Sequence, residues 1–226
     1  MENQKPDFSE ETHWEKAAKT RMGKYLTRLE TDFILKSLDI SQAQRIVDVG
    51  AEAGRFSLMA ANSNATVIGI DIDAYSLRRL KLKNKSVDVV QADARRMPLE
   101  NETFDAVLMI EVLDYIPELA ETLAECSRIL KQGSPLVLSF GNRSSLKAKL
   151  RELRGKSYTH SYGKVVQCLR KAGFTVTAKM GYSWPPLGRT SESRLVPFMA
   201  GMERLFRLRR MPSLSPWVIV HARKSG

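Results

Sequence analysis

The chain has few cysteines and no long apolar run, and both shortages exclude protein classes. Its 226 residues contain only Cys126 and Cys168, each at apolar-face spacing in a predicted helix. Two such cysteines do not form a disulfide framework, and we interpret them as small buried hydrophobic residues. The longest apolar stretches, such as AVLMIEVL, are much shorter than a membrane span, and no secretory h-region begins the sequence. A reducing, cytoplasmic location is therefore expected.

The usual glycine-rich motifs for binding phosphates are also missing. In IVDVGAEAGRFS (46–57), an apolar run containing Asp48 leads to Gly50, Glu52 and Gly54. A dinucleotide fingerprint needs glycines at positions 50, 52 and 55, and only the first is present. No lysine followed by serine or threonine closes the loop as in a P-loop. The sequence therefore argues against both a dinucleotide site and a nucleotide triphosphate site.

What is present is a strand, a glycine turn, a helix, a second strand and an acid. The second apolar run, VIGIDID (67–73), ends at Asp71, whose carboxylate can accept hydrogen bonds from both hydroxyls of a ribose. Glycine lets the backbone approach a ligand closely. This order of elements predicts one βαβ unit that holds a nucleoside. The structural alternative is a strand-to-helix turn that happens to carry two glycines.

The motif D-x-G-x-G-x-G, with Glu52 in place of its middle glycine, resembles motif I of the class I S-adenosylmethionine-dependent methyltransferases. The segment 87–140 is similar to the middle section of that family. Its FDAVLMI (104–110) matches the fourth strand, EVLDYIP resembles E-V-L-x-H-x-P, and LKQG resembles L-K-P-G-G. The resemblance covers about residues 40–182. It implies S-adenosylmethionine as cofactor and methyl transfer as the reaction.

The resemblance also implies which residues bind the cofactor. Asp93 is expected to accept a hydrogen bond from the adenine amino group, and the Ala94 amide to reach the ring. N-terminal helices are expected to close over the cofactor, with Trp14, Arg21 and Tyr25 as candidates to touch it. The full set of expected cofactor contacts is Tyr25, Asp48, Gly50, Ala51, Gly54, Asp71, Ile72, Asp93, Ala94 and Glu111.

Glu52 is a departure from the family pattern. Its carboxylate can turn outward, reach the positively charged amino group of the methionine moiety, or crowd the cofactor. The sequence does not choose among these three.

Alternating strands and helices predict an α/β fold with a doubly wound, mostly parallel seven-stranded sheet, the Rossmann-like methyltransferase fold. The resemblance implies strand order 3-2-1-4-5-7-6 with an antiparallel last strand. One domain is expected over 1–226, with cap helices in 1–40, a cofactor-binding core in 41–182, a helical substrate-side insertion in 183–214 and a final strand in 215–226. The predicted strands are 45–50, 65–71, 87–91, 104–110, 134–140, 174–182 and 215–224. The predicted helices lie in 13–38, 54–62, 74–84, 118–130, 144–155 and 161–173.

Charge is distributed unevenly along the chain. Residues 1–141 carry 18 basic and 22 acidic residues, a net charge of −4, whereas residues 142–226 carry 18 and 3, a net charge of +15. A basic surface indicates an anionic partner, or a solvated face. The segment 193–212 is predicted to form a basic amphipathic helix that contacts an anionic membrane, covers a pocket, or packs on the domain. In this predicted helix, one face carries Leu195, Phe198, Met202 and Leu205, and the opposite face carries Arg204, Arg207 and Arg210.

Catalytic side chains are expected after strands four and five, at the carboxyl ends of the sheet. Tyr115 stands where many small-molecule O-methyltransferases of the family have histidine, so a metal site is not predicted. His160 is the candidate replacement base, with a surface polar residue as its structural alternative, and Asn142 follows strand five. His13 and His221 have weaker claims.

The leading hypothesis is methyl transfer to a small-molecule acceptor, with oxygen as the acceptor atom and a lipid-linked or anionic acceptor in view of the basic C-terminal third. An RNA methyltransferase is the alternative among enzymes, although no RNA-binding module is recognisable. A cofactor-binding pseudoenzyme is the alternative from another class. Nothing in the sequence specifies an oligomeric state.

Overall fold

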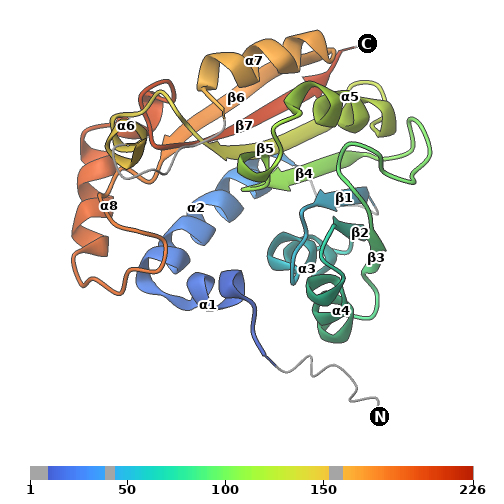
Figure 1. Cartoon of the computed structure of the whole chain (residues 1–226), viewed down its shortest axis with the longest axis horizontal. Helices are drawn as coiled ribbons and strands as arrows, with labels where there is room; N and C mark the ends of the chain where they lie inside the picture. The colour runs from blue at the N-terminus through green and yellow to red at the C-terminus, as the bar shows by residue number, and fades with distance from the viewer. Residues whose placement is uncertain (1–9, 39–43, 153–159, 226) are drawn as a thin grey trace.

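The computed structural model describes residues 10–38, 44–152 and 160–225. Residues 1–9, 39–43, 153–159 and 226 lie outside the described residues. They include parts of the expected cap region, of the predicted basic helix 144–155 and of the segment 215–226. Strand-forming runs rich in valine and isoleucine alternate with helices along the chain, as Figure 1 shows. The strands are β1 (Arg45–Val49), β2 (Thr66–Asp71), β3 (Asp88–Gln91), β4 (Ala106–Ile110), β5 (Pro135–Gly141), β6 (Phe174–Tyr182) and β7 (Trp217–Lys224).

All seven strands join one sheet in the order β3-β2-β1-β4-β5-β7-β6. Strands β1 to β5 pair in parallel, and β7 is antiparallel to both of its neighbours. This arrangement confirms the predicted fold class and strand order. The strand order reverses at β1, because β2 and β3 follow on one side of β1 and β4 lies on its other side. Open α/β sheets bind ligands at such a switch point, at the carboxyl ends of the strands.

Helices cover both faces of the sheet, as expected for a doubly wound fold (Figure 1). One core packs α5 and α7 against the sheet through residues such as Leu123, Cys126 and Leu169. The other packs α2, α3 and α4 through Met22, Phe56 and similar residues. The helices are α1 (His13–Lys19), α2 (Arg21–Ser37), α3 (Arg55–Ala61), α4 (Ala74–Lys83), α5 (Leu119–Ile129), α6 (Leu146–Glu152), α7 (Tyr162–Lys171) and α8 (Val196–Leu205), with 3-10 turns η1 (Leu113–Tyr115) and η2 (Leu208–Arg210).

The N-terminal region forms two helices that meet at a single extended residue. Thr12 and Glu15 form a capping box at the start of α1. Thr20 ends α1 and begins α2, and its hydroxyl accepts a hydrogen bond from the Gly23 amide. The same hydroxyl lies 2.7 Å from the carbonyl oxygen of Arg189, so this junction is attached to the insertion between β6 and β7.

The prediction of one amphipathic helix over 193–212 is wrong. Helix α8 ends at Leu205, and Arg207 adopts a left-handed conformation (φ 51°) before the short turn η2. Arg209 then turns back to the buried Glu203, with 3.0 Å between Nε and Oε1. This ion pair is a tertiary contact that helical periodicity does not encode. The three arginines at positions 204, 207 and 210 consequently do not continue along one helix.

Four large apolar side chains of this segment do not pack on the domain. Leu195, Phe198, Leu205 and Phe206 are 61 to 72% exposed, and only Val196 of α8 is a buried apolar residue. On α6, Leu146 and Leu150 are also exposed. Lys147 of α6 donates to the carbonyl oxygens of residues 183, 185 and 187, and Figure 1 shows α6 and α8 at the same end of the molecule.

Candidate functional site

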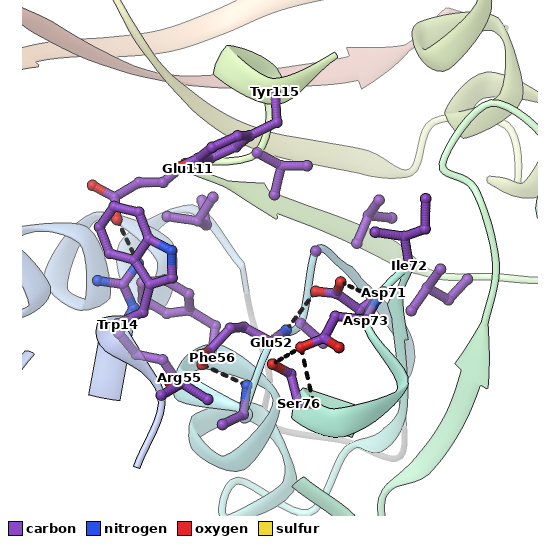
Figure 2. Close-up of a pocket in the computed structure, with 18 of the residues that line it drawn as sticks. Trp14, Glu52, Arg55, Phe56, Asp71, Ile72, Asp73, Ser76, Glu111 and Tyr115 are labelled. Carbon is purple, nitrogen blue, oxygen red and sulfur yellow. Dashed lines mark hydrogen bonds and ion pairs between the residues drawn. The ribbon is translucent and has the colours of Figure 1, made fainter. Parts of the chain in front are cut away.

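A cavity of about 1140 Å³ opens at the carboxyl ends of β1, β2, β3 and β4. Its walls come from α1, the glycine turn, the ends of these strands, and the segment that follows β4 (Figure 2). This volume exceeds the usual range for one small ligand, so it can hold a cofactor together with an acceptor.

The glycine turn places backbone directly against the cavity. Gly50 has φ +71°, and a Cβ there would lie 2.2 Å from a methyl carbon of Val112. Gly54 has φ +93° and a Cβ there would lie 2.3 Å from Leu80. Both positions therefore need glycine for conformation and for space. The turn closes through Gly50 and Ala51, whose amides both donate to the carbonyl oxygen of Ile70.

Asp48 supports the glycine turn through a side-chain hydrogen bond with Ser57 of α3. It is buried, and its Oδ2 accepts a hydrogen bond of 2.6 Å from the Ser57 hydroxyl. Burial raises the pKa of Asp48 to about 6, against the lowering effect of Ser57 and Arg55. The expectation that Asp48 touches a ligand is corrected: it is absent from the cavity wall and ties β1 to α3.

The acids after β2 and β3 line the cavity as predicted. Asp71 accepts hydrogen bonds of 2.9 Å from the amides of Glu52 and Asp73, which orients its carboxylate. Asp93 is held by Arg95, and this side-chain hydrogen bond, the largest cause, lowers the pKa of Asp93 to about 2. The carboxylate of Asp93 is therefore held in the ionised, accepting form, and two backbone amides orient that of Asp71.

Four charged side chains form a buried network beside the cavity. Glu111, just after β4, has a left-handed backbone (φ 64°) and accepts from Arg55 at 2.7 Å and from Arg189. Glu30 of α2 lies 3.1 Å from Arg189 and 3.4 Å from Arg55. Burial lowers the pKa of Arg189 to about 10. The network links the insertion to α2, α3 and the end of β4.

Helix α1 contributes a further wall of the cavity. Glu15 accepts from Arg79 of α4 at 2.7 Å and lies 2.5 Å from Lys83. Burial disfavours ionisation of Glu15, but these cations outweigh it and lower its pKa to about 2. Trp14 lines the cavity near Glu111 (Figure 2). The Arg189 guanidinium lies 5.9 Å from the Trp14 ring centroid.

Comparison with known proteins agrees with this geometry. Residues 47–138 match a family model described as a methyltransferase domain. The chain is 30% identical over 179 residues to a ubiquinone biosynthesis O-methyltransferase of Hahella chejuensis, covering 70% of this chain and 74% of that protein. The chain belongs to the class I S-adenosylmethionine-dependent methyltransferases.

Two further relatives show how far the likeness extends. The chain is 28% identical to 24-methylenesterol C-methyltransferase 2 of Arabidopsis thaliana over 77% of its own length, but spans about half (53%) of that enzyme. A geranyl diphosphate C-methyltransferase of Streptomyces coelicolor, solved with Mg²⁺, a substrate analogue and S-adenosyl-L-homocysteine, has a TM-score of 0.70 at 17% identity. That alignment covers 96% of this chain and 82% of the solved one. At this identity it shows the shared fold.

The cavity fits the cofactor of this methyltransferase family. Its wall carries eight acidic side chains and five lysines or arginines. S-adenosylmethionine carries a sulfonium and an ammonium against one carboxylate, so its net positive charge complements this wall. When bound, it would supply a methyl group that the sulfonium already activates, and the cavity residues would orient an acceptor and exclude water.

Nine of the candidate contact residues named from the sequence line the cavity. They are Trp14, Gly50, Ala51, Asp71, Ile72, Asp93, Ala94, Glu111 and Tyr115. The wall also contains residues that sequence reasoning missed, chiefly Glu15, Ala18 and Lys19 of α1 and the segment from Ile116 to Glu118. The family resemblance implied that N-terminal helices close over the cofactor, but it did not identify these further side chains.

The other predicted residues lie elsewhere. Gly54 supports the turn behind the wall. The Tyr25 hydroxyl lies 3.3 Å from Arg209 in the insertion, and burial raises the pKa of Tyr25 to about 12. The predicted ligand contact of Tyr25 is therefore replaced by a contact between α2 and the insertion. Arg21, a further candidate, is also outside the wall and lies near Glu192.

Two predicted catalytic residues are structural. Asn142 is fully buried, and its amide nitrogen donates to the carbonyl oxygens of Ser213 (2.9 Å) and Ser215 (3.1 Å). The fully buried His160 uses Nε2 to contact the Ile116 carbonyl oxygen at 2.8 Å, and burial lowers its pKa. Neither side chain lines the cavity, so both catalytic predictions are revised.

Tyr115 faces the cavity and is 68% exposed. Burial of its hydroxyl and the charge of Asp114 raise the pKa of Tyr115, so it favours the protonated, donating form. Across residues 10–38, 44–152 and 160–225, no group of three or more metal-ligating side chains comes together.

Proposed function

We propose that this methyltransferase transfers the methyl group to an oxygen atom of a small, largely apolar acceptor that it meets at an anionic membrane surface. The cavity has aromatic and aliphatic side chains in its wall, including Trp14, Phe56, Val112 and Ile116. The O-methyltransferase of Hahella chejuensis described above supports oxygen as the acceptor atom. The observation that carries the membrane part is the exposed apolar patch of α8 and its neighbours.

That patch combines exposed apolar side chains with arginines. Phe198, Leu205 and Phe206 are among its exposed residues, and Arg204, Arg207 and Arg210 are exposed beside them. Single exposed apolar residues are ordinary on a protein surface, but a group of them marks an interaction site. The net charge of +15 in residues 142–226 favours an anionic partner, and apolar side chains favour a lipid surface over a nucleic acid.

His13 replaces His160 as the proposed proton acceptor. His13 is the histidine in the cavity wall, begins α1, and lies edge-on to Trp14 with 5.4 Å between ring centroids. The carboxylates of Glu15 and Asp93 are held by cations that lower their pKa to about 2, which makes them weak bases. An imidazole nitrogen can accept the proton of an acceptor hydroxyl as methyl transfer proceeds.

The acceptor is found by incubating the protein with S-adenosylmethionine labelled in its methyl group and with separate lipid, RNA and metabolite extracts. We expect label in the lipid or apolar metabolite fraction. Hydriodic acid cleaves O-methyl ethers and releases the label, whereas a C-methyl group keeps it. Label in RNA, or label that resists cleavage, contradicts the proposal. With the acceptor known, His13→Ala should lower kcat and leave the affinity for S-adenosylhomocysteine nearly unchanged.

Membrane contact is tested with vesicles containing anionic phospholipid at low salt. Replacing Arg204, Arg207 and Arg210 with glutamine should weaken binding about 100-fold, because each arginine contributes about 1 kcal/mol at such a surface. The matched control replaces the exposed Lys36, Lys85 and Arg96 with glutamine and should change binding little. If the native protein does not bind these vesicles, the membrane part is wrong. RNA binding with a steep salt dependence would favour the RNA alternative.

The proposed location is the cytoplasm. Cys126 is buried, Cys168 is partly buried, and both are free thiols. Burial raises the pKa of Cys126 to about 12, so it is an unreactive core residue. None of the described helices is long and apolar enough to cross a membrane.

A further inference from the structure

Glu52 occupies the position where the resembled motif has its middle glycine, and its backbone has the conformation of that glycine. Its φ is 50°, in the left-handed region that side chains rarely adopt. The Glu52 amide donates to Asp71 at 2.9 Å, which holds the turn in this shape. A strained non-glycine residue in a ligand-binding turn suggests that its side chain has a use there.

The Glu52 carboxylate is only half satisfied. Its Oε2 accepts a hydrogen bond of 2.5 Å from the Ala53 amide. Its Oε1 is shielded from solvent and has no hydrogen-bond partner among the described residues. A carboxylate oxygen that loses water without gaining a donor is unfavourable, and native structures rarely keep one without a reason.

The nearby cations are already engaged. Arg55, three residues along, pairs with Glu111 at 2.7 Å and with Glu30 at 3.4 Å. Lys83 pairs with Glu15 at 2.5 Å and donates to the Ala53 carbonyl oxygen at 2.7 Å. The cavity wall also has more acids than bases. Neither Arg55 nor Lys83 contacts the Glu52 carboxylate, so a cation brought by a ligand can satisfy its free oxygen.

The position of Glu52 indicates which part of the cofactor it meets. Figure 2 shows Glu52 between Asp71 and Ile72 on one side and Trp14 and Glu111 on the other. Asp71 lies where the ribose is expected, so the amino-acid end extends toward Trp14 and Glu111. Glu111 already accepts from two arginines, which leaves it less able to take another cation.

We propose that the Glu52 carboxylate binds the α-ammonium group of the cofactor's methionine moiety. Rotation about the side-chain bonds of Glu52 presents Oε1 to the cavity that this residue already lines. An ammonium offers three donors and a full charge, so it satisfies the oxygen that the free protein leaves without a partner. The substitution at position 52 thus adds a side-chain contact where a glycine has none.

The test compares three ligands by calorimetry at low salt, without any acceptor. S-adenosylmethionine has the sulfonium and the ammonium, S-adenosylhomocysteine lacks the sulfonium, and 5′-methylthioadenosine lacks the amino-acid portion. For Glu52→Gln, we expect both amino-acid ligands to bind about 10- to 100-fold more weakly and 5′-methylthioadenosine to bind within about twofold of the native protein. Glu100→Gln, an exposed acid outside the cavity, is the matched control.

Each other pattern overturns the proposal. Weaker binding of S-adenosylmethionine alone assigns Glu52 to the sulfonium. Weaker binding of all three ligands assigns it to the ribose or to the shape of the turn. No change shows that the side chain turns outward.

Glu52→Gly separates binding from folding. Glycine relieves the left-handed backbone, so this variant should unfold at the same or a higher temperature than the native protein and still lose affinity for the two amino-acid ligands. A glycine variant that binds S-adenosylhomocysteine as tightly as the native protein contradicts the proposal. Because no acceptor is present, these results do not depend on which molecule is methylated.

Discussion

The cofactor half and the C-terminal third of this chain use charge in opposite ways. In residues 10–141, acids around the cavity are held by cations from other elements, as Glu15 is by Arg79 and Lys83. In the insertion, Arg204, Arg207 and Arg210 are exposed, and no ion pair joins them to the described residues. Arg189 is the exception, because it leaves the insertion and enters the buried network with Glu111 and Glu30.

This difference shows that an arginine side chain has a different role when it is buried than when it is exposed. A buried, paired guanidinium fixes the relative positions of elements, and losing it leaves an uncompensated charge. An exposed arginine contributes little to folding and remains available to a partner. The following changes test that contrast.

The largest effect is expected for Arg189→Met. Its removal leaves Glu111 and Glu30 with less compensation in a buried site, so the free energy of unfolding should fall by about 3–5 kcal/mol in urea titrations. Arg204→Met, in the same insertion but exposed, should change it by less than about 0.5 kcal/mol. Equal effects of the two substitutions would show that burial and pairing do not distinguish Arg189 from Arg204.

Asp48 should make stability depend on pH. Its pKa is raised to about 6 in the folded protein, chiefly by burial, from an ordinary value near 3.8. The folded state therefore binds the proton more tightly, and this group lowers the free energy of unfolding as pH rises from about 4 to about 6. Relative to the native protein, Asp48→Asn should gain about 2 kcal/mol over that window and stay level above it. A difference that is flat from pH 4 to 7 contradicts this.

Asp71→Ala tests the cofactor half without disturbing the insertion. Loss of the expected ribose contacts should weaken S-adenosylhomocysteine binding by about 1–3 kcal/mol, measured by calorimetry. Asp32→Ala, on the exposed side of α2, should leave affinity unchanged. NAD should bind neither variant nor the native protein. Unchanged affinity in Asp71→Ala would withdraw the assignment of this residue.

The smallest effects come from a pair of glycines, one in each region. Gly201→Ala in α8 should stabilise the protein by about 0.5–1 kcal/mol, because nothing lies within 4 Å of the added Cβ and alanine favours a helix. Gly54→Ala should destabilise it, because φ is +93° and the Cβ would meet Leu80 at 2.3 Å. Thermal unfolding measures the stability change of each variant. Stability changes of the same sign at both positions would contradict the expected difference between the two glycines.

The parts of the site that sequence predicted are those fixed by local backbone. Gly50, Asp71 and Asp93 follow directly from strand ends, so their places in the cavity wall depend on the order of elements. His160 and Asn142 follow strands or precede helices in the same way, but each bonds to backbone carbonyl oxygens from a distant segment. The order of elements predicted the region in which these two residues lie, but it did not predict the direction in which their side chains point.

The sequence by itself determined the alternation of strands and helices, the glycine turn and the acids at the strand ends, because these depend on short-range periodicity and on backbone conformations that few residues adopt. Tertiary structure alone decided which side chains of α1 line the cavity, that Arg189 enters a buried network, and that α8 ends at Leu205 with Phe198 and Leu205 exposed. Those outcomes rest on contacts between residues far apart in the chain, whose energies depend on burial and on partners that no local pattern specifies.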